Sequence, residues 1–245
     1  MSAQPQLKII GHRGAAGLLP ENTLASFSRA VELGVDAVEL DVHAWAGKLW
    51  VIHDHKLDRT TSGTGPLSRY SLEQLRKLDA GNGAQIPFLE EVFTVVPESI
   101  PINIELKGKD TAAPVADFLA QTAARDLLVS SFDHQELARF QNLAPDQPVA
   151  PLFDRWRGDP VAVGVRFASR YINLSRKITT EARCRQIISA GFQILVYTVN
   201  DPAEAASLLA MGVKGVFTDY PDRLRAAFPA LKAGFPGLRA DFPAR

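Results

Sequence analysis

The sequence KIIGHRGAAGLLPENTLASFSRAVELGVDAVELDV, residues 8–42, holds a full strand–helix–strand pattern. Residues 8–11 are an apolar run that ends in glycine, which predicts a short buried strand. The Pro20–Thr23 turn leads into a predicted amphipathic helix over 23–34, and a second apolar strand is expected over 36–42. Two strands separated by a helix favour parallel pairing through a right-handed crossover, and therefore an α/β fold.

The same alternation continues along the rest of the chain. Further strands are predicted over residues 48–54, 100–106, 126–132, 148–153, 171–174, 193–199 and 212–219. Further helices are predicted over residues 71–78, 87–96, 111–124, 134–143, 179–191 and 201–212. We expect a TIM (β/α)8 barrel, with an open doubly wound sheet as the alternative. The G-x-G-x-x-G and G-x-x-x-x-G-K-[ST] nucleotide motifs are absent from the sequence, which weakens that alternative.

One predicted strand is surplus to an eight-stranded barrel. We therefore expect residues 36–42 and 48–54 to form either a hairpin or one extended second strand. The segment Leu57–Gln85 is long and rich in turn residues, and we interpret it as a small insertion on the catalytic face. Residues 229–245 are interpreted as a C-terminal extension, so that residues 1–245 form a single barrel domain.

The composition excludes several classes of protein. Lys and Arg number 27 and Asp and Glu also number 27, and a net charge of zero argues against a nucleic-acid-binding protein. The single cysteine, Cys184, cannot form an intrachain disulfide and is expected to be a buried thiol. No apolar run approaches the ~18 residues of a membrane span. We expect a cytoplasmic protein, monomeric or homodimeric, that acts on a small molecule.

Several carboxylate side chains lie within predicted strands whose other residues are apolar and are expected to be buried. Side chains alternate along a strand, so Glu39 and Asp41 share one face of the second predicted strand. Buried like charges repel and lose hydration unless a cation or a proton compensates. Glu105, near the end of another apolar strand, offers a third carboxylate. Three such donors suit one divalent cation, Mg²⁺ or Ca²⁺, with Mn²⁺ also compatible. The alternative is a structural ion network with Arg13 and Lys107.

Two histidines stand at predicted strand ends. His12 follows the first strand directly, and His53 lies near the end of the third. If that strand curls inward, His53 faces His12 across the mouth of the barrel. Two imidazoles on either side of a phosphodiester can act as an acid/base pair. Arg13 adds a planar cation that can bind phosphate oxygens in a bidentate manner.

Seven segments resemble, in this order, the glycerophosphodiester phosphodiesterase family: GHRGAAGLLPENTLASF, VELGVDAVELDVH, VIHDHKLDRTTSGTG, INIELKG, SSFD, YTVN and GVFTDYPD. The similarity extends from about Ile9 to Arg223, and its HRG…ENT, E-x-D and HD-x-x-L-x-R-T-T elements are specific in combination. Within the family, PLFDRWRGDP and ILVYTVN resemble the bacterial cytosolic enzyme that is associated with glycerol-3-phosphate uptake. Tyr197 stands where many relatives carry tryptophan.

The resemblance implies a TIM barrel with an inserted segment, and it implies a role for each candidate residue. It assigns catalysis to His12 and His53. It assigns the other positions to the divalent cation (Glu39, Asp41 and Glu105) and to the substrate phosphate (Arg13 and Lys107).

The activity implied is metal-dependent hydrolysis of glycerophosphodiesters to sn-glycerol 3-phosphate and an alcohol, a reaction of lipid and glycerol metabolism. One alternative is lysophospholipase D-type hydrolysis of lysophospholipids, which needs an apolar groove that Trp45, Trp50 and Leu18–Leu19 could line. Another alternative is a non-catalytic barrel that binds a phosphorylated ligand. The complete set of histidines and carboxylates argues against mere binding, because a binder needs no acid/base pair.

Overall fold

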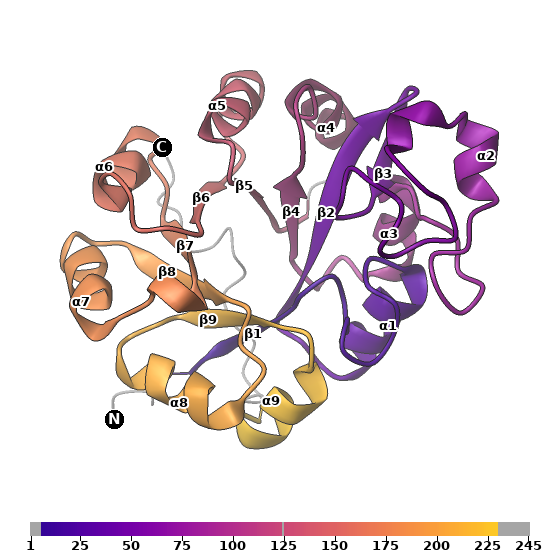
Figure 1. Ribbon diagram of the computed structural model, residues 1–245. Coiled ribbons are helices and arrows are strands. Elements are labelled where there is room, and N and C mark those ends of the chain that lie inside the picture. The colour runs from indigo at the N-terminus through magenta and orange to yellow at the C-terminus, as the bar shows by residue number, and fades with distance from the viewer. Residues whose placement is uncertain (1–5, 124, 230–245) are drawn as a thin grey trace.

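Eight parallel strands form a closed barrel that helices surround (Figure 1). The structure is a computed structural model that describes residues 6–123 and 125–229. The order of neighbouring strands is β1-β9-β8-β7-β6-β5-β4-β2, and pairing between β1 and β2 closes the ring. The predicted TIM barrel is thus confirmed, and its strands are β1 (Lys8–Gly11), β2 (Ala37–Trp45), β4 (Ile102–Leu106), β5 (Leu127–Ser131), β6 (Val149–Phe153), β7 (Tyr171–Ser175), β8 (Gln193–Tyr197) and β9 (Gly215–Thr218).

Helices connect consecutive strands of the barrel and lie on its outside (Figure 1). They are α1 (Leu24–Glu32), α2 (Leu72–Arg76), α3 (Leu89–Val95), α4 (Ala112–Ala120), α5 (His134–Leu143), α6 (Pro160–Arg166), α7 (Glu181–Ser189), α8 (Pro202–Ala210) and α9 (Pro221–Ala227). Polar side chains cap the first turns of several helices, as the Thr23 hydroxyl does by accepting from the backbone N–H of Ser26. The sequence patterns did not predict α6 or α9.

Alternation along the strands separates two cores. Val38, Leu40 and Val42 of β2 point outward into the large core between barrel and helices. The residues between them face the barrel axis. Apolar side chains form a second core inside the barrel, and these are Ile10, Ala37, Leu128, Ala150, Tyr171, Leu195 and Phe217. The interior is therefore packed with apolar side chains on one level, and its polar residues gather on another.

The surplus strand forms the hairpin that was one of the two expected arrangements. β3 (Lys48–Val51) pairs antiparallel with β2, with Val42 opposite Val51 and Trp45 opposite Lys48. The segment 57–85 follows it and contains α2 together with a short 3₁₀ turn. A small core of its own holds this segment, formed by Trp50, Ile52, Leu57, Leu67, Leu75, Ala80 and Ile86.

Three further expectations concern the single cysteine, membrane-spanning segments and the C-terminal extension. Cys184 is a free, buried thiol, as predicted. Among the described residues, no helix is both long and apolar enough to cross a membrane. The predicted extension over 229–245 falls outside the described residues from position 230 onward.

Replacing Trp50 tests how much the small core of segment 57–85 contributes to stability. Its side chain is fully buried, and its ring packs edge-on against Phe88 with ring centroids 4.6 Å apart. Trp50→Ala is expected to lower the free energy of unfolding by about 3–5 kcal/mol, because it leaves a cavity. Trp45→Ala is the matched control: Trp45 is 37% exposed and donates one hydrogen bond to the Tyr70 carbonyl. Loss of this hydrogen bond should lower the free energy of unfolding by about 1 kcal/mol, and urea titration of both variants measures the two changes. Equal losses of stability in the two variants would contradict the role of Trp50 in the small core of segment 57–85.

Candidate active site

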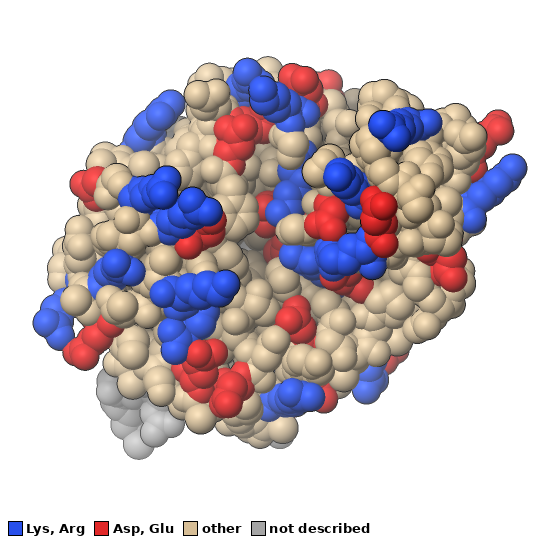
Figure 2. Space-filling model, in the orientation of Figure 1, with Lys and Arg blue, Asp and Glu red and all other residues tan. Residues whose placement is uncertain are grey.

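A cavity of about 100 Å³ opens at the carboxyl ends of the barrel strands. Figure 2 shows charged side chains of both signs around a hollow at the centre of the molecule. Six of the seven predicted site residues line this cavity: His12, Arg13, Glu39, His53, Glu105 and Lys107. The seventh, Asp41, is fully buried behind them. The structure therefore brings the whole predicted set together at the end of the barrel where enzymes of this fold carry their chemistry.

The three carboxylates meet because of the register between β2 and β4. Asp41 lies opposite Glu105, and Glu39 lies opposite Asn103. One oxygen from each of Glu39, Asp41 and Glu105 lies within 4.8 Å of the others, and all three side chains are buried. Oxygen donors at this spacing, drawn from two adjacent strands, can converge on one hard cation.

Burial and the neighbouring charges shift the pKa values of all three carboxylates. Burial, followed by the charges of Asp41 and Glu105, raises the pKa of Glu39 well above its ordinary value. Burial also raises the pKa of Glu105 to about 7, although Lys107 opposes the rise. Burial alone would raise the pKa of Asp41, but attraction to Lys107 and Arg13 lowers it to about 2. Without a cation, the cluster therefore retains protons at a pH where ordinary glutamates are ionised, and a divalent cation could take the place of those protons.

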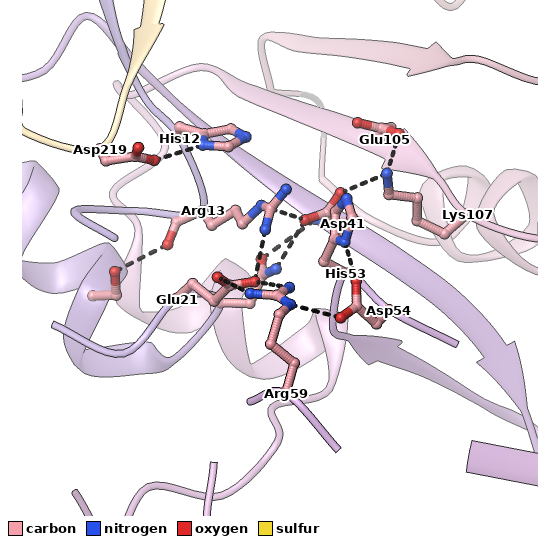
Figure 3. Close-up of polar contacts among 12 residues, drawn as sticks. His12, Arg13, Glu21, Asp41, His53, Asp54, Arg59, Glu105, Lys107 and Asp219 are labelled. Atoms are coloured by element: carbon pink, nitrogen blue, oxygen red, sulfur yellow. Dashed lines mark hydrogen bonds and ion pairs between the residues drawn. The ribbon is translucent and has the colours of Figure 1, made fainter. Parts of the chain in front are cut away.

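Two cations already contact the cluster (Figure 3). Lys107 Nζ lies 3.3 Å from Asp41 Oδ1 and 2.5 Å from Glu105 Oε1. Arg13 Nε lies 3.1 Å from Asp41 Oδ2, and the Arg13 backbone N–H donates to Glu39 Oε2 at 2.9 Å. The ion network that was the alternative interpretation therefore exists. It sets two positive charges against a cluster that would carry three negative charges if every carboxylate were ionised, as cation binding requires.

The loop after β1 presents Arg13 in an unusual backbone conformation. Arg13 has a positive φ of 52°, and its carbonyl accepts a hydrogen bond from the Ser26 hydroxyl at 2.9 Å. The next residue, Gly14, also has a positive φ, and a Cβ there would lie 2.5 Å from Ser26 Oγ. Glycine is thus required at position 14, and the tight turn aims the Arg13 N–H at Glu39.

His12 is held by a carboxylate that the sequence analysis did not single out. Its Nδ1 lies 2.7 Å from Asp219 Oδ1, and Asn200 Nδ2 donates to Asp219 Oδ2 at 2.8 Å. Asp219 follows β9 directly, and β9 pairs with β1. Burial, the largest single effect, opposes ionisation of Asp219, but the hydrogen bond and charge of His12, together with the hydrogen bond from Asn200 and the charge of Arg13, lower the pKa of Asp219. The expected closure of the barrel was the signal that could have placed Asp219 beside His12.

His53 has the same kind of partner. Its Nδ1 lies 2.5 Å from Asp54 Oδ1, and Arg59 donates from Nε to Asp54 Oδ2 at 2.7 Å. Burial, as the largest effect, lowers the pKa of His53. The neighbouring His43 lies with Nε2 3.0 Å from the carbonyl of His53, which supports the loop that carries the ring. Each candidate histidine thus has its Nδ1 occupied by a carboxylate.

An aromatic wall completes the cavity. Phe132, Leu152, Tyr197 and Phe217 line the cavity together with the charged residues. Phe132 and Tyr197 pack edge to face with centroids 5.6 Å apart, and Lys107 Nζ lies 5.5 Å from the Phe132 ring. Of the residues expected to line an apolar groove, Trp50 instead belongs to the core of segment 57–85.

Comparison with known proteins agrees with this geometry. The model of the glycerophosphoryl diester phosphodiesterase family matches residues 12–223. The chain belongs to this family. Membership identifies it as an enzyme that hydrolyses phosphodiesters, and the predicted resemblance is confirmed.

Individual family members match over most of their length. The YhdW protein of Bacillus subtilis (strain 168) is 37% identical over 231 residues, which cover 87% of this chain and 95% of the relative. A glycerophosphodiester phosphodiesterase of Bacillus altitudinis is 35% identical, with 88% and 96% covered. A phosphodiesterase of Oleispira antarctica, solved in complex with the product sn-glycerol-3-phosphate, superposes with a TM-score of 0.87 at 29% identity, with 92% and 98% covered.

Proposed function

We propose that the enzyme hydrolyses glycerophosphodiesters to sn-glycerol 3-phosphate and an alcohol. The observation that carries the proposal is the joint placement of His12, His53 and the three-carboxylate cluster around one cavity. The product bound by the Oleispira antarctica phosphodiesterase supports the same choice of substrate.

The two histidines are proposed as the acid/base pair. Because Asp219 and Asp54 occupy the Nδ1 atoms of His12 and His53, Nε2 of each ring is the atom that exchanges a proton with the substrate. In the first step one imidazole accepts the proton of the glycerol 2-hydroxyl, and the other donates a proton to the departing alkoxide. In the second step water opens the cyclic phosphate and the two roles reverse. Either histidine can begin as the base.

Glu39, Asp41 and Glu105 are the proposed ligands of one divalent cation. When bound, such a cation would neutralise negative charge on the phosphate oxygens. The charges of the site agree with this assignment. Once the cation has displaced their protons, the three ionised carboxylates together with Arg13 and Lys107 carry one net negative charge, which the divalent cation and a singly charged phosphodiester bring to zero. Oxygen ligation suits Mg²⁺, Ca²⁺ and Mn²⁺ alike.

Arg13 and Lys107 are the proposed phosphate-binding side chains. Both line the cavity, and both are largely shielded from water, with side-chain exposures of 15% and 14%. The guanidinium of Arg13 can donate in parallel to two phosphate oxygens, and Lys107 supplies a compact charge. Their positions beside the carboxylates let them stabilise charge that accumulates on the phosphoryl oxygens in the transition state.

The direct test is release of glycerol 3-phosphate from glycerophosphocholine by the purified protein. The protein is treated with EDTA, and each divalent cation is then restored in turn. We expect release that stops with EDTA and returns with at least one of Mg²⁺, Ca²⁺ or Mn²⁺. Absence of release with every cation, from protein with a cooperative unfolding transition, would refute the proposed substrate.

Choline release, which both substrates share, compares lysophosphatidylcholine with glycerophosphocholine and so tests the lysophospholipase D alternative. Phe132, Leu152, Tyr197 and Phe217 give the cavity an apolar side, but its volume of about 100 Å³ is small beside a long acyl chain. We therefore expect slower turnover of the lysolipid than of glycerophosphocholine. Binding of glycerophosphocholine with no product after prolonged incubation with cation would instead support the non-catalytic barrel.

The proposal extends to the cellular compartment and the oligomeric state of the enzyme. We place the enzyme in the cytoplasm, as a monomer or homodimer. A single, free and buried cysteine supports a reducing compartment, because the protein has no disulfide to maintain.

A further inference from the structure

A bridge of ion pairs joins the inserted segment to both sides of the site (Figure 3). Arg59 donates from Nε to Asp54 Oδ2 at 2.7 Å. The same guanidinium donates from Nη1 and Nη2 to the two oxygens of Glu21, at 2.7 and 2.8 Å. Asp54 contacts Nδ1 of His53, and Glu21 accepts from Arg13 at 2.7 Å. One side chain of the insertion therefore contacts the partners of two proposed functional residues.

The backbone beneath Arg59 is fixed independently of its guanidinium. Arg59 lies in a turn that follows Leu57, which is fully buried in the small core of segment 57–85. The N–H of Thr61 donates to the Leu57 carbonyl at 3.0 Å, and the Leu57 N–H donates to Gly65 at 2.9 Å. Asp58 Oδ2 accepts from the Gly65 N–H at 2.8 Å. The turn thus presents Arg59 to the site from a rigid base.

We propose that Arg59 is a positioning residue that sets the orientation of His53 through Asp54 and of Arg13 through Glu21. The inference rests on the proposed function, in which His53 exchanges a proton with the substrate and Arg13 binds its phosphate. Three N–H groups in one plane satisfy two carboxylates at once, which a lysine ammonium on a flexible chain cannot reproduce.

A role in fold stability does not explain this bridge. The Arg59 side chain is 48% exposed, so water screens its ion pairs, and even as a bidentate network they contribute only modestly to the free energy of unfolding. Its loss would free the Asp54 carboxylate to rotate away from His53 and would leave Glu21 paired with Arg13 alone. The effect should therefore appear in the geometry of the site rather than in the stability of the chain.

Steady-state kinetics of Arg59→Gln tests the proposal. With saturating cation, we expect kcat for glycerophosphocholine to fall about 10–100-fold, the usual effect of losing an outer partner of a functional side chain. Thermal unfolding should be unchanged. Arg59→Lys should recover only part of the loss, and methylguanidine added to Arg59→Ala should restore part of kcat. Arg69→Gln is the matched control, since Arg69 is an exposed arginine of the same segment that does not line the cavity.

Imidazole NMR supplies a measurement that does not depend on turnover. The chain has five histidines, so the His53 ring signals can be assigned with His53→Gln. Arg59→Gln should shift the His53 ring nitrogen signals and leave those of His134, at the start of α5, in place. Unchanged kcat together with unchanged His53 signals would overturn the proposal. If the wild-type protein releases no glycerol 3-phosphate, the proposed function fails on its own, and the NMR comparison still decides whether Arg59 positions His53.

Discussion

Replacing His12 or His53 by alanine will lower kcat for glycerophosphocholine by about 10²–10⁴-fold, the range that a positioned acid or base contributes. Each ring lines the cavity and has its Nδ1 beside a carboxylate, so each variant removes a proton-transfer group that is already oriented. KM should change much less than kcat, because the phosphate and the glycerol keep Arg13 and Lys107. Initial rates at saturating cation measure both constants.

His55→Ala is the control for this prediction. His55 is exposed, lies two positions from His53 and does not line the cavity, so its removal should leave kcat unchanged. A wild-type kcat in His12→Ala or His53→Ala would contradict the acid/base assignment. A phosphodiester with a p-nitrophenol leaving group then separates the two roles. That leaving group needs no proton, so the variant that lacks the first-step acid should lose less activity on it than the other variant.

Replacing Glu39 by glutamine should move activity and stability in opposite directions. The change removes one of three crowded negative charges that converge on the proposed cation, so cation affinity and kcat should fall by at least the 10–100-fold typical of outer partners. The cation-free protein should become more stable, since its pKa shift shows that the ionised Glu39 is disfavoured by burial and by its neighbours. Isothermal titration with Mg²⁺, Ca²⁺ and Mn²⁺ and thermal unfolding in EDTA measure the two effects.

Glu90→Gln is the matched control, because this carboxylate pairs with Lys48 at the surface, away from the cavity. It should change neither cation affinity nor kcat. If Glu39→Gln bound cation as tightly as the wild type, the three-carboxylate assignment would be wrong. Loss of affinity without any gain in stability would indicate that Arg13 and Lys107 already compensate the cluster fully.

The pH dependence of this site follows from Glu105. Burial is the main reason that its pKa rises from 4.5 to about 7 in the cation-free protein. Between these two values the folded chain holds a proton that the unfolded chain has released. Stability in EDTA should therefore fall as the pH rises through this interval. Cation binding must displace the same proton, so cation affinity should weaken as the pH falls below about 7. Isothermal titration in buffers of different ionisation enthalpy measures the proton that cation binding releases.

Much of the fold followed from the strand alternation alone. All nine predicted strands occur, and inward-facing Glu39 and Asp41 agree with the period of two along β2. The sequence could not decide between a hairpin and an extended strand at residues 36–54, because the choice depends on the turn at Ala46–Gly47, where both residues have positive φ. Helix α6 was missed because its short run, PVAVGVR, lacks a clear polar face.

The candidate site was predictable where it lay on strands and less so where it depended on loops. Asp219, Glu21 and Arg59 come from three separate connections, and only the folded barrel brings Asp219 to His12 and Arg59 to Glu21. Spacing along the chain carries no signal for such contacts. The aromatic wall was missed for a similar reason, since Phe132, Tyr197 and Phe217 are distant in sequence and come together only in the folded barrel, where Tyr197 packs against both phenylalanines.

The apolar core inside the barrel has a consequence for the enzyme's throughput. Tyr171, Leu195 and Phe217 help to fill the interior of the barrel, so apolar side chains close the candidate site on that side. Under the proposed function, the diester therefore enters and both products leave at the carboxyl ends of the strands. A phosphorylated product that stays bound there occupies the charges that the next diester needs. Turnover would then depend on how quickly the phosphorylated product dissociates.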